Sequence, residues 1–190
     1  MIAICLLPLA CLAGEWIEDP SAVPLLHDEG QSAERYRILA DFNGNGIMDM
    51  ALSCSVSLFG NAGGQFTVYI QNEDGRFRRL GEFFGHPMAL ALERVGEKVR
   101  LWTYVRGGGW IGQIGFYDVK EDGLSDYHGI TIHPGDSGTK MGNAIYEAVM
   151  RNSDLPITVE RSRTENEKVE WTNPNKAVLP IAASAAQTDR

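Results

Sequence analysis

Cysteine is scarce in this chain, and its scarcity excludes the class of small domains that disulfides hold together. Three cysteines occur in 190 residues, and two of them, Cys5 and Cys11, fall within the apolar residues 1–14. If that segment is removed, Cys54 remains alone and no disulfide framework can form within one chain. Cys54 lies in an apolar run, so we interpret it as a small core residue. No Cys and His spacing typical of a zinc site is present.

Positive charge is also in short supply. The chain has 17 Lys and Arg against 25 Asp and Glu, which gives a formal net charge of −8. An acidic protein repels phosphate backbones, so we expect no nucleic acid partner. The same sign of charge suits a divalent cation.

A hydrophobic run long enough to span a bilayer is missing, and we expect no transmembrane segment. Residues 1–14, MIAICLLPLACLAG, are apolar and end in small residues, which resembles a secretory signal cleaved after Ala13 or Gly14. We therefore expect an exported protein, periplasmic or secreted. No Lys or Arg precedes this run, which leaves open an earlier start or a buried strand. A lipoprotein anchored through Cys11 is a further alternative, although Pro8 stands where a lipobox usually has leucine.

Alternation of apolar and polar residues predicts a mainly β fold, an antiparallel meander within one domain at residues 15–159. Residues 65–71, QFTVYIQ, alternate with period two, and NEDG at 72–75 supplies the Gly and Asx residues of a tight turn. The same pattern predicts about eight strands, at residues 36–40, 49–56, 65–71, 76–84, 88–95, 99–105, 111–119 and 124–132.

An internal repeat underlies this spacing. A shift of 48 residues aligns GQFTVYIQNEDG at 64–75 with GQIGFYDVKEDG at 112–123, with six identities in twelve positions. A period near 50 is typical of four-stranded propeller-blade units, so we predict two related units at about 35–84 and 85–133. Two units cannot close a propeller, and they must pack on each other or under a helix.

A single amphipathic helix is predicted after the strands, at about residues 139–151. Met141, Ile145 and Val149 recur at i, i+4 and i+8 and would form its apolar face. Residues 160–190 are polar and are predicted to be a flexible tail.

The segment DFNGNGIMD, residues 41–49, concentrates short oxygen-bearing side chains. Calcium takes six to eight oxygen ligands, which a compact loop can supply from alternate positions. Positions 1, 3, 5, 7 and 9 of this loop would supply them from Asp41, Asn43, Asn45, the Ile47 carbonyl and Asp49. Gly46 at position 6 permits the sharp bend that such a loop needs. A metal-free turn is the alternative, because Asn-Gly pairs are common in hairpins.

The loop differs from an EF-hand. Position 12 is Leu52 instead of a bidentate glutamate, and the flanking segments are predicted to be strands. Two carboxylates balance the charge of Ca²⁺, so we expect a weak site with a Kd of about 10⁻⁴ to 10⁻³ M.

The stretch ILADFNGNGIMDMALS resembles the repeat motif of the FG-GAP/VCBS family, and NAGGQFTVYIQNEDGRF resembles the continuation of such repeats. The resemblance covers about residues 35–80 and implies a calcium-binding β module of an exported protein. Carried over by position, it implies the same five ligands. The chain has Asn45 where the family usually has aspartate, and the second unit has only the short VGEK turn at 95–98, so one site is expected.

Two other motifs suggest different functions. GDSG at 135–138 occurs around the serine of trypsin-like proteases, but the other parts of that constellation are missing and we interpret it as a turn. We therefore expect no enzyme, and a hydrolase using Ser137 with His133 or His128 is the remaining alternative. Trp102 and Tyr104 share one predicted strand face and, with Trp110, could bind a glycan or an envelope protein.

Overall fold

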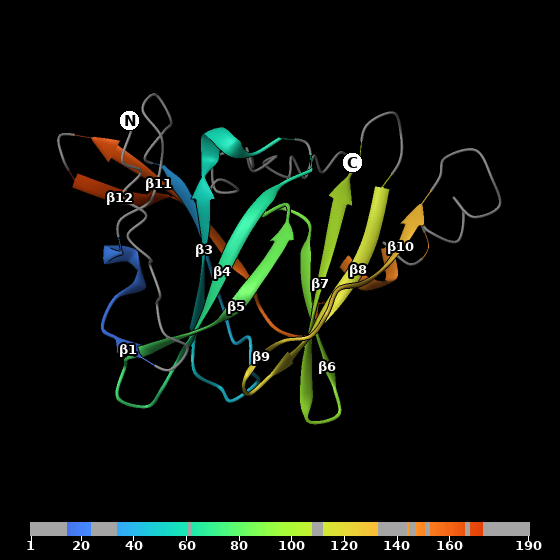
Figure 1. The fold of residues 1–190 in the computed structure, drawn as a ribbon, viewed down its shortest axis with the longest axis horizontal. Helices are drawn as coiled ribbons and strands as arrows, with labels where there is room; N and C mark the ends of the chain where they lie inside the picture. Colours follow the sequence, from blue (N-terminus) through green and yellow to red (C-terminus); the bar gives the residue numbers. More distant parts are fainter. Residues whose placement is uncertain are drawn as a thin grey trace, which may run out of the picture.

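The computed structural model describes residues 15–23, 34–60, 62–107, 112–132, 144, 147–150, 153–165 and 168–172. Within these residues the fold is mainly β and every strand pairing is antiparallel, as the sequence predicts. The strands form two sheets that lie side by side, as Figure 1 shows. The leader at 1–14 and residues 173–190 lie outside the described part of the chain.

The first sheet has seven strands in the order β1-β5-β4-β3-β2-β11-β12. Their bounds are β1 Trp16–Ile17, β2 Arg35–Ala40, β3 Asp49–Ser55, β4 Gly64–Gln71, β5 Phe77–Gly85, β11 Thr158–Glu165 and β12 Lys168–Thr172. Strands β2 to β5 form the meander predicted for the first unit. Two short 3₁₀ helices, η1 Pro20–Ala22 and η2 Val56–Leu58, accompany this sheet.

The second sheet has five strands, with β10-β8-β7-β6 in order and β9 paired to β8. Their bounds are β6 Leu90–Val95, β7 Lys98–Arg106, β8 Gly112–Lys120, β9 Gly123–Leu124 and β10 His128–Ile132. A single meander of eight strands does not form, because β5 and β6 belong to different sheets. The two predicted units instead contribute to separate sheets.

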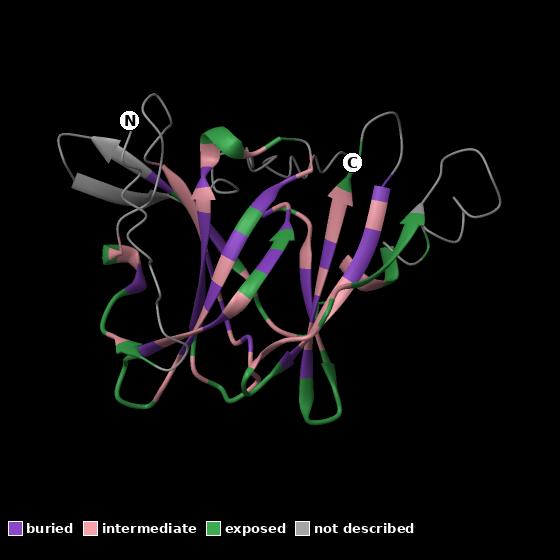
Figure 2. Cartoon of the chain, in the orientation of Figure 1, coloured by how far each residue is buried: buried purple, intermediate pink, exposed green. Residues whose placement is uncertain are grey.

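The two sheets share one apolar core. On β4 the buried positions alternate with less buried ones, as the period-two pattern requires, and Phe66 stacks on Phe83 of β5 with ring centroids 5.0 Å apart. From the second sheet, Leu92, Leu101 and Val119 join the same buried cluster. Figure 2 shows this alternation as bands along the strands. The units therefore bury their apolar faces on each other, one of the two packings that the repeat predicts.

The first sheet continues beyond residue 159, where the sequence predicts that the β domain ends and a tail begins, because β11 and β12 belong to it. Val159 on β11 is buried in the core, and Glu160 forms an ion pair with Arg37 of β2. The sequence of β11, TVERSRTE, is mostly polar, so its composition alone predicts a tail.

The predicted helix at 139–151 is described only at residues 144 and 147–150, which are helical and exposed or half-buried. A helix that covers either sheet with an apolar face is therefore not shown. Among the described residues, no helix is both long and apolar enough to cross a membrane.

Candidate metal centre

The predicted calcium loop connects β2 to β3 and ends at Asp49, the first residue of β3. Two of its glycines have left-handed backbone angles, with φ of 77° at Gly44 and 87° at Gly46. Gly46 is the residue for which the sequence predicts this conformation, because L side chains rarely adopt it.

Asp41, Asn43 and Asn45 fold the loop around their own oxygens. Asp41 accepts hydrogen bonds from the backbone N–H of Gly44 at 2.7 Å and of Gly46 at 2.9 Å. Asn43 Oδ1 accepts from the N–H of Asn45 at 3.0 Å, and Asn45 Oδ1 accepts from that of Ile47 at 2.8 Å. The bonds accepted by Asn43 and Asn45, from the N–H two residues on, are Asx-turn hydrogen bonds, and Asp41 accepts from the N–H groups three and five residues on. Together these bonds orient side-chain oxygens along a tight loop.

The carboxylate of Asp49 is the most buried polar group of the loop, with 0% exposure. Its Oδ2 accepts from Phe42 N at 2.8 Å and Asn43 N at 3.3 Å, and its Oδ1 accepts from Gln71 N of β4 at 2.8 Å. The pKa of Asp49 is raised to about 7, mainly by burial and also by the charge of Asp41, while the three N–H donors oppose the rise. In the described part of the chain neither Asp41 nor Asp49 forms an ion pair with a basic side chain.

The donor set fits calcium by its chemistry. Asp41, Asn43 and Asn45 each accept one N–H per bonded oxygen, and a carboxylate or amide oxygen has two lone pairs, so each can accept a further bond. Asp49 already accepts three N–H bonds, so of these side chains it has the fewest lone pairs left to bind an ion. No group of three or more His, Cys, Asp or Glu that could hold a metal occurs among the described residues. A site here would therefore depend on asparagine and backbone oxygens, the hard ligands that calcium accepts.

The loop also packs against the second sheet, which sequence reasoning missed. Arg94 Nη1 of β6 donates to the Gly44 carbonyl at 3.3 Å, and a Cβ added at Gly44 would lie 2.9 Å from Val99 Cγ2 of β7. Phe42 is buried in the shared core with 0% exposure. An apolar residue inside a polar loop was the one sequence signal for this anchoring.

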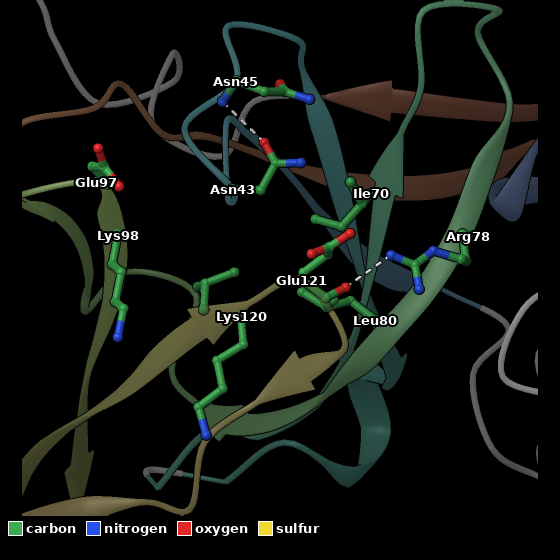
Figure 3. Close-up of a pocket in the computed structure, with 10 residues that line it drawn as sticks. Asn43, Asn45, Ile70, Arg78, Leu80, Glu97, Lys98, Lys120 and Glu121 are labelled. Atoms are coloured by element: carbon green, nitrogen blue, oxygen red, sulfur yellow. Dashed lines mark hydrogen bonds between the residues drawn. The ribbon is translucent and has the colours of Figure 1, made fainter.

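A pocket of about 410 Å³ adjoins the loop between the two sheets. In Figure 3, Asn43 and Asn45 lie at the top of the view, Glu97 and Lys98 at the left, Ile70 and Arg78 at the right, and Leu80, Lys120 and Glu121 lower, between them. The two asparagines therefore line a space that solvent can enter, whereas Asp49 is fully buried.

Of the other predicted site residues, Trp102 and His128 line one groove of the second sheet. Trp102 and Tyr104 are half-buried on the outer face of β7, and Trp102 Nε1 donates to Glu93 at 2.8 Å. His128 lies on β10 with its ring 5.4 Å from that of Phe116. Trp110, His133 and Ser137 lie outside the described residues, so the hydrolase constellation is not tested.

Comparisons with protein-family models, with curated proteins and with solved structures return no match. The resemblance of the loop to the FG-GAP/VCBS repeat therefore stays a prediction from its motif.

Proposed function

We propose that the chain is an exported, non-enzymatic β protein in which the β2–β3 loop binds one structural Ca²⁺. One observation carries the proposal: Asp49 is a fully buried carboxylate with Asp41 nearby and no ion-pair partner in the described residues. Buried charges in proteins are usually paired or coordinate a metal. The oxygens of Asp41, Asn43, Asn45, Asp49 and the Ile47 carbonyl would hold the ion.

The bound ion would stabilise the folded protein. It would supply the positive charge that the two carboxylates lack and would fix the connection between β2 and β3. Binding to the folded state alone stabilises it by RT ln(1 + [Ca²⁺]/Kd), about 2.7 kcal/mol at a hundredfold excess over Kd.

The test is the melting temperature of the protein with added calcium and with a chelator, for the parent and two asparagine variants. Asn45→Ala removes a predicted ligand and its Asx-turn bond. The matched control is Asn72→Ala, because Asn72 Oδ1 also accepts a backbone N–H, that of Arg76 at 2.9 Å, in the β4–β5 turn, which supplies none of the proposed ligands.

We expect calcium to raise the melting temperature of the parent and of Asn72→Ala by the same amount, and to raise that of Asn45→Ala less. Asn72→Ala lowers the melting temperature equally with and without calcium. A parent protein that melts at one temperature under both conditions would show that the loop is a metal-free turn.

A further inference from the structure

Three of the four sheet edges carry features that prevent pairing with another chain. Strand β1 is two residues long, and β12 carries the charges of Lys168 and Glu170 in its sequence. The edge of β6 is capped, because Leu92 N donates to Ser153 Oγ at 3.0 Å and Arg94 N donates to Asp154 Oδ2 at 2.8 Å. Short, charged or covered edges are the usual protection against edge-to-edge association.

The fourth edge, β10, lacks these features. Its sequence, HGITI, contains no Lys, Arg, Asp, Glu or Pro, and it pairs with β8 over five residues. Among the described residues no strand lies on its other side. Ile130 is 49% exposed, and Figure 2 colours the described part of β10 as exposed. Within the described part of the chain, the outer edge of this strand has no strand partner, and the apolar side chain of Ile130 lies exposed beside it.

A groove of about 460 Å³ runs beside this edge. Pairing of His128 with Phe116, of Ile130 with Ile114 and of Trp102 with Phe116 places their side chains on one sheet face. The rings of Trp102 and Phe116 lie 4.9 Å apart, and Ile114 is buried with 1% exposure at the floor of the groove. The groove is thus an aromatic and aliphatic site next to an open strand.

We propose that β10 and this groove bind an extended peptide segment, which adds to the sheet as a sixth strand and inserts an apolar side chain into the groove. In this mode of recognition, backbone hydrogen bonds to an edge strand supply affinity and side-chain pockets supply specificity. Because the protein has a net charge of −8, the segment is uncharged or basic instead of acidic. This binding site does not depend on the calcium loop.

A peptide suits the site better than a second copy of the chain. A strand of five residues is about 17 Å long. Pairing two copies through it would bury only a small part of the roughly 1,200–2,000 Å² typical of a stable interface. A single segment needs no larger surface, since it can use both the edge and the groove.

The probe is the peptide acetyl-Lys-Thr-Phe-Thr-Val-Lys-amide, which places Phe and Val on one face of an extended strand. We compare it with a version carrying Glu in place of both Lys, and with two versions N-methylated at alternate backbone nitrogens so that each blocks one edge. Binding is followed by anisotropy of the labelled peptide and by NMR shifts of the protein backbone amides.

We expect saturable binding with the largest shifts at His128–Ile132, loss of binding for one of the two N-methylated peptides, and at least tenfold weaker binding of the Glu version. The variant Ile130→Lys should weaken binding at least tenfold. The control Val95→Lys, at a residue 42% exposed on the capped strand β6, should bind like the parent.

Equal binding of both N-methylated peptides would overturn the proposal, even if Ile130→Lys fails to fold. Shifts confined to other strands would also overturn it. A protein that is dimeric through β10 and ignores the peptides would show that the edge pairs with a second copy instead.

Discussion

At the scale of single residues, Asp49 holds the β2–β3 loop against the first sheet. Its carboxylate accepts hydrogen bonds from N–H groups of the loop and from that of Gln71 of β4, and these bonds need no metal ion. The cost is a buried negative charge beside Asp41. Under the proposed function, a proton and calcium would therefore compete to neutralise the Asp49 carboxylate.

The calcium-free protein should lose stability as pH rises from about 4 to about 7. The pKa of Asp49 is raised from 3.8 to about 7 in the folded state. Between these two pH values the Asp49 carboxyl is ionised in the unfolded chain but still protonated in the folded protein, so a rise in pH favours unfolding. The change is about 1.4 kcal/mol for each unit by which the two pKa values differ. Urea unfolding at pH 5 and pH 8 measures it, and calcium should remove most of the difference.

Asp41→Asn is the matched control for this pH effect. It removes the neighbouring charge that helps to raise the pKa of Asp49, so the stability difference between pH 5 and pH 8 should shrink. Calcium-free protein that is more stable at pH 8 than at pH 5 would contradict the assignment.

At the scale of elements, the strands of the two units could be read from the sequence because one face of each is buried. β4 alternates between buried and less buried residues at every position, and the turn NEDG before β5 is equally clear. β11 could not be predicted, since its sequence TVERSRTE is mostly polar and its position depends on pairing with β2, far away in the chain.

The same distinction applies to the candidate site. The spacing of Asp41, Asn43, Asn45 and Asp49 predicts a loop rich in oxygens. Local hydrogen bonds, which the first three of these side chains accept from loop N–H groups, produce it. The bond from Gln71 and the contact of Gly44 with Val99 could not be predicted, because they join segments that only the tertiary fold brings together.

Replacing the two glycines of the loop separates backbone strain from packing on the second sheet. Gly46→Ala should cost about 1–2 kcal/mol, the penalty for an L residue in the left-handed region, because nothing lies within 4 Å of the added Cβ. Gly44→Ala should cost more, since its Cβ would also press on Val99, which is buried with 1% exposure. Urea denaturation without calcium measures both. Equal losses of unfolding free energy for the two variants would show that the loop does not pack against the second sheet.

At the scale of the whole molecule, β11 and β12 complete the first sheet and contribute Val159 to its core. A chain ended after residue 157 should therefore be less stable than the full chain or should lose cooperative unfolding. Thermal unfolding followed by circular dichroism compares the two. If the shorter chain melts at the parental temperature, β11 is not an integral strand.

The position of β11 beside β2 also sets the order in which the molecule can form. Arg35 N donates to Ser162 Oγ at 2.7 Å across 127 residues of sequence. During synthesis β2 emerges early, and its neighbour on that side follows only after the whole second sheet has been made. Contacts of such long sequence separation slow folding. The open side of β2 therefore exposes a nascent chain to aggregation, and it is a surface that a chaperone could protect.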